Sequence, residues 1–324
     1  MLIGTVKEKY VGEKRIALTP DIAGRLVADG IEVCIEKNAG CGAGFDNESY
    51  ARQGVKIENS AYKVYTSCNM IFKIWAPYGK EWHNLKHTPI ILADFSRLRR
   101  LPDMPIRAFA LNKIPRISRA QNMDILSSQS NLSGYKAAIA ALDSINRIAP
   151  MMITAAGTLP PIKVLIWGLG VAGLQAAATF RRNGAKVFAA DIRPETSEQA
   201  ASVGAIFIPS EKVVERIAEF DIIITAAGNY RQAPLLITRE TFASIPTHNL
   251  VMDISGNVEK KIVADNLIRE YNGASALAHS ASLLFAENLY RFFRLIYDFP
   301  SQNINVDFND EIIKQTYIGE KRNV

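Results

Sequence analysis

The chain has 324 residues, of which 48% are hydrophobic and 22% are charged, and its formal net charge is +6. This length predicts two domains, and the composition excludes a disordered or fibrous protein. The Lys and Arg residues are scattered, so no continuous basic stripe indicates nucleic-acid binding.

Cysteine and histidine are scarce. Cys34, Cys41 and Cys68 lack CxxC spacing, and with only four histidines the sequence indicates neither a disulfide framework nor a zinc site. The first twenty residues lack the apolar core and cleavage site of a secretory signal, and no segment resembles a membrane span of about 20 apolar residues. We therefore expect a cytoplasmic protein without a metal.

Short apolar runs alternate with helical stretches along the N-terminal third of the chain, which predicts parallel strand–helix units. The expected strands are residues 2–6, 32–36, 70–75, 90–93 and 106–110, with a helix at 22–28. Residues 125–148 contain few helix breakers, so we expect them to form a helix that leads into a second α/β series.

That second series has expected strands at residues 163–167, 186–190, 205–208, 221–225 and 250–254. Residues 281–299 have a helical pattern but include Glu287 and Arg291, which favours a core-packed or interface helix over a membrane-lying one. We predict an α/β fold with two Rossmann-like domains, each with a parallel sheet, and a ligand cleft between them. The first domain would comprise residues 1–127 and 281–324, and the second residues 128–280.

A GxGxxG pattern follows the strand at 163–167. Gly168 permits a tight turn, Gly170 lets the backbone approach a pyrophosphate, and Gly173 lets the next helix pack on the strand. The pattern is weak evidence alone, but a helix follows at residues 171–182 and a second strand after it ends in an acid. This order predicts a dinucleotide site with the anion at the helix N-terminus.

The acid is Asp191, 18 residues after Gly173 and close to the expected spacing of about 20. A carboxylate there accepts hydrogen bonds from the adenosine ribose and repels the 2′-phosphate of NADP, so the site should prefer NAD(H). Asp191 could instead be a helix-capping or surface acid. Arg193 could pair with a 2′-phosphate or be a solvated loop residue.

Polar side chains gather just before and at the start of the connecting helix, in PRISRAQNMDILSSQSNLSGY. Arg116, Gln121, Asp124 and Ser127 offer a donor fork, an amide, an acceptor and a hydroxyl, which suit a carboxamide and a ribose. The alternative is helix capping by Ser118 or Asp124 in a solvated loop.

This segment, together with MMITAAGTLPPIKVLIWGLGVAGLQA and the opening GEKRIALTP, resembles the NAD(H)-binding domain I of the proton-translocating NAD(P) transhydrogenase alpha subunit, in its standalone alpha-1 form. That family is related to alanine dehydrogenase. The resemblance covers nearly the whole chain, and the two long motifs are specific to transhydrogenases.

The resemblance implies direct hydride transfer from NADH to NADP bound on a partner domain, with Arg116, Gln121 and Asp124 orienting the ring. It implies separate membrane and NADP-binding subunits that translocate protons, peripheral attachment to the inner membrane through them, and a homodimer. The residues that it assigns to the nucleotide are Arg116, Ile117, Ser118, Gln121, Asp124, Ser127, Gly168, Gly170, Val171, Gly173, Asp191, Ile192 and Arg193.

Two alternatives stay open, and the first is an alanine or opine-type NAD-dependent dehydrogenase. Arg15 and Lys73 match the positions with which alanine dehydrogenases bind a substrate carboxylate, but PIILADFSRL lacks the histidine that those enzymes use, so the two cations are more simply inherited framework. A non-catalytic NAD-binding paralogue is the second alternative. It is motivated by residues 209–220, which are short where transhydrogenases have a long mobile segment, and by shortened stretches near residues 255–257 and 275–279.

Overall fold

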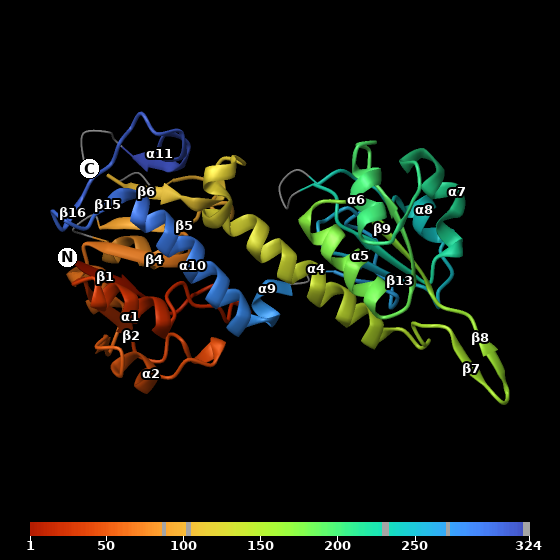
Figure 1. Cartoon of the computed structure of the whole chain (residues 1–324), viewed down its shortest axis with the longest axis horizontal. Helices are drawn as coiled ribbons and strands as arrows, with labels where there is room; N and C mark the ends of the chain where they lie inside the picture. The colour runs from red at the N-terminus through yellow and green to blue at the C-terminus, as the bar shows by residue number, and fades with distance from the viewer. Residues whose placement is uncertain (86–88, 102–104, 229–232, 270–272, 320–324) are drawn as a thin grey trace. The chain divides into compact units, whose positions relative to one another are not determined.

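The structure is a computed structural model that describes residues 1–85, 89–101, 105–228, 233–269 and 273–319. The chain divides into two compact units (Figure 1). Unit 1 comprises Met1–Gln129 and Ser275–Val324, and unit 2 comprises Ser130–Ala274. Unit 1 is therefore built from both ends of the chain, whereas unit 2 is one continuous segment.

The described residues of unit 1 contain a seven-stranded sheet in the order β17-β6-β5-β4-β1-β2-β3. Its strands are β1 (Leu2–Thr5), β2 (Glu32–Glu36), β3 (Lys56–Glu58), β4 (Met70–Trp75), β5 (Ile90–Asp94), β6 (Arg107–Ala110) and β17 (Tyr317–Gly319). All neighbours are parallel except β17, which runs antiparallel to β6. The sequence did not predict β3 or β17, because three residues are too few to show a periodicity.

The helices of unit 1 include a long one from the C-terminal segment. They are α1 (Pro20–Ala28), α2 (Asn47–Ala51), α3 (Ala61–Ser67), α10 (Ala278–Ile296) and α11 (Glu311–Thr316), with 3-10 helices η1 (Cys41–Ala43), η2 (Gly79–Asn84), η3 (Leu111–Lys113) and η4 (Ser118–Met123). A small hairpin of β15 (Tyr297–Asp298) and β16 (Asn303–Ile304) follows α10. The short helix α9 (Gly273–Ala276) precedes α10.

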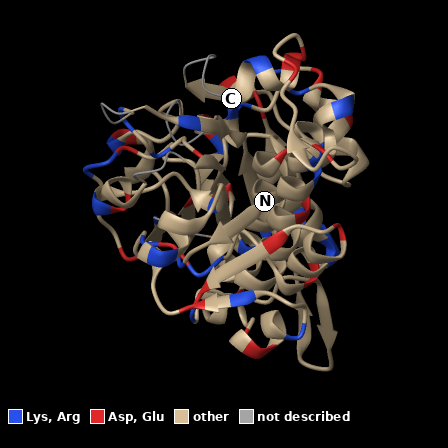
Figure 2. Ribbon diagram, turned by 90° about the vertical axis from the view of Figure 1, so that its left-hand side faces the viewer, with Lys and Arg blue, Asp and Glu red and all other residues tan. Residues whose placement is uncertain are grey.

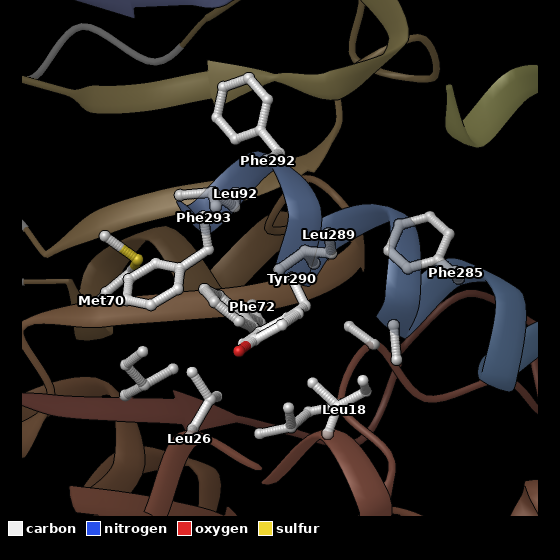
Figure 3. Close-up of a cluster of buried hydrophobic side chains, with 14 of the residues drawn as sticks. Leu18, Leu26, Met70, Phe72, Leu92, Phe285, Leu289, Tyr290, Phe292 and Phe293 are labelled. Atoms are coloured by element: carbon white, nitrogen blue, oxygen red, sulfur yellow. The ribbon is translucent and has the colours of Figure 1, made fainter. Parts of the chain in front are cut away.

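Helix α10 supplies a large share of the unit 1 core. Figure 3 shows Phe293 beside Met70, Phe72 and Leu92, whereas Phe292 points to the other side, where its ring meets that of Phe109. Phe292 and Phe293 are fully buried, and the Phe293 ring meets the Phe72 ring edge-on at 5.9 Å between centroids. Each such side chain contributes about 1.5–3 kcal/mol when it leaves water. The helix expected at residues 281–299 is thus core-packed.

Unit 2 contains a six-stranded sheet in the order β11-β10-β9-β12-β13-β14, and every described neighbour pair is parallel. Its strands are β9 (Lys163–Trp167), β10 (Lys186–Ala190), β11 (Ile206–Phe207), β12 (Ile222–Thr225), β13 (Leu250–Asp253) and β14 (Leu267–Ile268). Counted along the chain this is the order 3-2-1-4-5-6, which is typical of dinucleotide-binding folds. The order reverses between β9 and β12, where ligands bind in such sheets. The predicted α/β fold with mainly parallel sheets is confirmed.

The helices of unit 2 are α4 (Ile125–Ser144), whose first five residues belong to unit 1, α5 (Val171–Arg182), α6 (Thr196–Ser202), α7 (Val213–Arg216) and α8 (Arg239–Ala243), with η5 (Ser210–Lys212) and η6 (Ile217–Glu219). The prediction that α4 extends to residue 148 is wrong. After Ser144 the chain bonds to the sheet instead, because Arg147 pairs with Asp221 and the Ala149 carbonyl accepts a hydrogen bond from Ile162 N at 3.1 Å.

An antiparallel hairpin of β7 (Met152–Thr154) and β8 (Gly157–Leu159) projects from the rest of unit 2 (Figure 1). The sequence did not predict it, because two strands of three residues are too short to show a periodicity. Ile153 is 73% exposed and Leu159 52%. The hairpin therefore buries little apolar surface within the chain.

Lys and Arg alternate with Asp and Glu along the ribbon in Figure 2, and no run of one charge crosses that view. None of the described helices is both long and apolar enough to cross a membrane. Within the same residues, no group of three or more His, Cys, Asp or Glu side chains could hold a metal ion.

Candidate functional site

The glycine turn lies between β9 and α5, beside the point where the strand order of unit 2 reverses. Gly168 has φ +108°, which side-chain-bearing residues rarely adopt. A Cβ at this position would lie 2.5 Å from Ala227 N and 2.6 Å from Ala226 C. Gly168 is therefore required by the chain's own geometry, both for the turn and for the close approach of the segment after β12.

Gly173 is also required by packing. A Cβ there would lie 1.9 Å from the Gly168 carbonyl oxygen, so only glycine lets α5 lie this close to the turn. Gly134, in α4, has a similar role, because its Cβ would lie 2.0 Å from the Ala172 carbonyl oxygen. Gly173 thus brings α5 onto the glycine turn, and Gly134 brings α4 into backbone contact with the first turn of α5. No pattern in the sequence indicated this role for Gly134.

Gly170 differs from both. Its φ of −76° and ψ of −172° are open to any residue, and no heavy atom lies within 4 Å of where its Cβ would be. No side chain caps α5 at this position. Nothing within the described chain therefore requires glycine, but a phosphate drawn to the positive end of α5 does require a bare backbone. The residues present fit a pyrophosphate at this place.

Asp191 follows β10 and is bonded to the glycine turn. Its Oδ2 accepts a hydrogen bond from Leu169 N at 2.8 Å, and its carboxylate is gripped by the Arg193 guanidinium at 2.9 and 3.0 Å. Burial by itself would raise the pKa of Asp191, but the hydrogen bonds from Arg193 and Leu169 outweigh it and hold that pKa below its ordinary value. The carboxylate is thus ionised at neutral pH.

Apolar side chains are exposed on either side of this acid and glycine turn. Ile192 is 83% exposed directly after Asp191, and Val171 is 40% exposed at the first position of α5. Both are positions that the resemblance assigned to the nucleotide. Exposed aliphatic groups beside a bare helix N-terminus suit the flat faces of a bound adenosine.

A buried polar network supports the segment against which Gly168 packs. Asp253, at the end of β13, accepts hydrogen bonds from Thr225 Oγ1 and from Asn257 N, both at 2.8 Å. The Asn257 side chain then accepts from Ala227 N at 3.1 Å and donates to the Ala227 carbonyl at 2.9 Å. The sequence did not predict this network, although Asp253 at the end of an apolar run and Asn257 four residues later were available signals.

The loop before α4, in unit 1, is anchored from the C-terminal helices. Arg119 pairs with Asp310 of α11 at 2.7 Å, and Asn288 of α10 donates to the Asn122 carbonyl at 2.8 Å. Ala120 and Met123 are buried in the unit 1 core. These side-chain bonds and the packing of the two buried residues therefore hold the backbone of residues 116–125 in place.

The polar side chains that the sequence singled out in this loop fall into two groups. Arg116, Ser118 and Gln121 are exposed, and no hydrogen bond or ion pair ties them to the described residues of the chain. Asp124 instead accepts bonds from Leu126 N at 2.9 Å and Ser127 Oγ at 2.6 Å. Asp124 thus caps α4, as one alternative foresaw, whereas Ser118 does not. The anchored backbone of this loop therefore presents exposed hydrogen-bond donors on Arg116, Ser118 and Gln121. Such an arrangement can bind a polar ligand without rearrangement of the loop.

Arg15 and Lys73 both lie in unit 1, and both are already matched by carboxylates. Arg15 is 4% exposed and grips Glu13 at 2.8 and 2.6 Å. Lys73 is fully buried, with Nζ 3.3 Å from both Glu8 Oε2 and Glu81 Oε1. Burial would lower the pKa of Lys73, but the two carboxylates outweigh it and raise that pKa.

Two family models together span the chain. Residues 4–133 match the alanine dehydrogenase/PNT N-terminal domain, and residues 137–324 match the alanine dehydrogenase/PNT C-terminal domain. The chain belongs to the alanine dehydrogenase/PNT family.

Within the alanine dehydrogenase/PNT family, the chain is 34% identical over 370 residues to an NAD(P) transhydrogenase subunit alpha protein of Rhodospirillum rubrum, and the match covers 98% of this chain and 96% of the relative. The structure of a transhydrogenase from Sinorhizobium meliloti matches with a TM-score of 0.89 at 33% identity and covers 99% of both chains. An L-alanine dehydrogenase structure matches with a TM-score of 0.82 at 21% identity, which shows the shared fold. The resemblance to a transhydrogenase component, an oxidoreductase that works with nicotinamide nucleotides, is confirmed.

The alignment to the Rhodospirillum protein also bears on the shortened segments. It extends over 370 positions although this chain has 324 residues, so the relative has residues that this chain lacks. In unit 2 the short connection after β11 is compact, with Val213, Ile217 and Phe220 buried. The connection is therefore a packed segment rather than a long loop.

The ion pairs that Arg15 and Lys73 make with carboxylates of the chain help to distinguish a transhydrogenase from an alanine dehydrogenase. A substrate carboxylate needs an unpaired cation, and replacing an existing buried partner would leave that partner charged and unpaired. Both cations here serve to hold the chain's own carboxylates. Their geometry therefore favours the framework role over amino-acid binding.

Proposed function

We propose that this chain is the NAD(H)-binding component of an NAD(P) transhydrogenase, and that hydride passes directly from NADH to NADP bound on a partner domain. The observation that carries the proposal is Gly170, the one glycine of the turn that the described chain itself does not require. It leaves bare backbone at the start of α5, where a pyrophosphate would sit. The transhydrogenase relatives are consistent with this reading.

In this proposal Gly168, Gly170, Val171 and Gly173 hold the pyrophosphate, and Asp191, Ile192 and Arg193 flank the adenosine ribose. Arg116, Ile117, Ser118, Gln121, Asp124 and Ser127 contact the nicotinamide and its ribose. The bound nucleotide supplies the hydride, so no side chain needs to act as a general acid or base. The chain's contribution is position: the anchored loop presents Arg116 and Gln121 in one orientation.

We further propose that the partners are an NADP-binding subunit and membrane subunits that couple transfer to proton translocation. The chain would then be cytoplasmic and attached to the inner membrane only through those subunits.

The decisive experiment mixes this chain with an isolated transhydrogenase NADP-binding domain, NADPH and a reducible NAD analogue. Transfer of hydride to the analogue, dependent on both proteins, is expected. NADH oxidation with pyruvate and ammonium should be absent, because Arg15 and Lys73 are already paired; turnover there would establish an alanine dehydrogenase. Tight NADH binding without transfer would establish a non-catalytic paralogue.

Asp191 is expected to make the chain bind NADH more tightly than NADPH. Repulsion between its ionised carboxylate and a 2′-phosphate is worth about 1–4 kcal/mol at about 4 Å, and Arg193 offsets part of it. Asp191→Asn should lower the ratio of the NADPH to the NADH dissociation constant by about tenfold, which corresponds to about 1.4 kcal/mol. Arg193→Ala should raise the same ratio. Competitive fluorescence titration measures both, and equal wild-type affinities would contradict the prediction.

We also propose that the chain forms a homodimer and that the β7–β8 hairpin contributes to it. The hairpin exposes Met152, Ile153 and Leu159. A two-stranded hairpin is marginally stable alone, and exposed apolar side chains on it suit a protein–protein contact. Ile153→Asp should convert a dimer into a monomer, as read from light scattering after gel filtration. Gln199→Asp, at an exposed position of α6, serves as a control for added charge outside the hairpin. A wild-type monomer would refute the proposal.

A further inference from the structure

Two of the three cysteines lie in contact inside unit 1. Cys34 is the third residue of β2, and Cys68 directly follows α3. Their Sγ atoms are 3.2 Å apart, and both side chains are buried. The third cysteine, Cys41, is exposed in η1.

Gly4 of β1 provides the space for this pair. It lies beside Cys34 in the parallel register of β1 and β2, and a Cβ on it would lie 2.4 Å from Cys68 Sγ. The Cys68 sulfur thus occupies the volume that any other residue at position 4 would fill. The chain places the two sulfurs together by omitting a side chain.

A disulfide requires an S–S distance of about 2.05 Å, so the two sulfurs need to approach by about 1.2 Å. Cys34 is held within β2 by its pairing with β1 and β3, but Cys68 has extended backbone angles at the end of a seven-residue helix. The helix end is the segment that can shift. A Cys34–Cys68 disulfide can therefore form if Cys68 moves while Cys34 stays in place.

The two thiols are not equivalent. Cys68 retains 5% exposure and Cys34 none. A hydrogen bond from the Cys34 thiol lowers the pKa of Cys68, and the same bond together with burial raises the pKa of Cys34. The residue with the remaining exposure, Cys68, is thus also the one whose pKa is lowered, which is the arrangement of an attacking thiolate and a resolving thiol.

We propose that Cys34 and Cys68 form a reversible intrachain disulfide when the protein meets a peroxide. The Cys68 thiolate attacks one peroxide oxygen, the O–O bond breaks, and a sulfenic acid and one water result. The Cys34 sulfur then attacks the Cys68 sulfur, the S–O bond breaks, and a second water leaves. Two thiols lose two electrons and two protons in all, and one hydrogen peroxide is reduced to two waters.

The bond would tie β2 to the connection between α3 and β4. The two cysteines are separated by 34 positions, so the disulfide restricts the unfolded chain and stabilises unit 1 when oxidised. Strand β4 begins two residues after Cys68 and carries Lys73 among the buried charges. The disulfide would thus restrain the sheet beside the buried cluster of Lys73, Glu8 and Glu81.

The test uses the full chain with Cys41→Ser, which leaves only the pair. After hydrogen peroxide treatment of the folded protein, thiols counted in denaturant should fall from two to none and return to two after dithiothreitol. Mass spectrometry of the unreduced digest should show the Cys34–Cys68 cross-linked peptide. The midpoint of thermal unfolding should rise by about 5 °C on oxidation, as expected for a closed loop of this length.

Matched variants make the result decisive. Cys34→Ser and Cys34→Ala, each in the Cys41→Ser background, should give no cross-link and no rise in the unfolding midpoint, with circular dichroism reporting that they are folded. Two free thiols remaining after a treatment that fully oxidises Cys41 in the wild type would overturn the proposal. Sulfinic acid on Cys68 with Cys34 still free would overturn it as well.

Discussion

Replacing Gly170 with valine is expected to weaken NADH binding by at least about 100-fold, which corresponds to about 2.7 kcal/mol. The valine methyl groups would occupy the open space beside the start of α5, where the proposed pyrophosphate needs the bare backbone. The midpoint of thermal unfolding should change by no more than about 4 °C, because the added Cβ points into open space and the substitution mainly gives a poorer helix cap.

The matched control is Gly173→Val, three residues away in the same motif. Here the added Cβ would lie 1.9 Å from the Gly168 carbonyl oxygen, so the variant should lose stability by several kcal/mol whether or not nucleotide is present. Isothermal titration with NADH and thermal unfolding of both variants separate the two roles. Wild-type NADH affinity in Gly170→Val would show that the space beside Gly170 is not a phosphate site.

Removing the free donors of the loop before α4 is expected to slow hydride transfer rather than weaken binding. Arg116→Ala and Gln121→Ala should each lower the transfer rate at saturating NADH by about 100-fold, the size of effect that a small misplacement of a reacting group produces. The NADH dissociation constant should change by less than about fivefold, because the pyrophosphate contacts remain.

Lys113→Ala is the control for this pair, since Lys113 is an exposed cation in the same segment with no assigned role. It should transfer hydride at the wild-type rate. Arg119→Ala is a second comparison, because it removes the 2.7 Å pair with Asp310 that anchors the loop. Stopped-flow measurement of transfer together with NADH titration distinguishes position from affinity. A loss of affinity in Arg116→Ala with an unchanged rate at saturation would contradict the prediction.

The sequence predicted the strands around the glycine turn to the residue, because β9, β10 and α5 have strong apolar patterns and clear end signals. It predicted Gly168 and Gly173 correctly as turn and packing residues. The distinction between these and Gly170 needed coordinates, since the letter G does not show which neighbour a Cβ would meet. The packing role of Gly134 could not be predicted for the same reason, because this glycine contacts the backbone of another helix.

The anchoring of the polar loop was also beyond the sequence. Asn288 reaches Asn122 and Ser128 across more than 150 positions, and no local pattern predicts such a partner. A buried asparagine on the apolar face of α10 was a usable signal, but it indicates a hydrogen bond and not its recipient. Long-range polar contacts of this kind depend on how the helices pack.

The split of unit 1 between the two ends of the chain has a consequence for synthesis. A chain emerging from the ribosome can complete unit 2 from Ser130–Ala274 alone, because that segment contains the whole of its sheet. The first 129 residues emerge earlier, and although α1 covers part of the sheet face, the rest stays uncovered until Phe285 to Phe293 of α10 arrive. The earliest segment of the chain to be made is therefore the last to finish folding, and a ribosome that stalls before residue 285 leaves that apolar face open to aggregation.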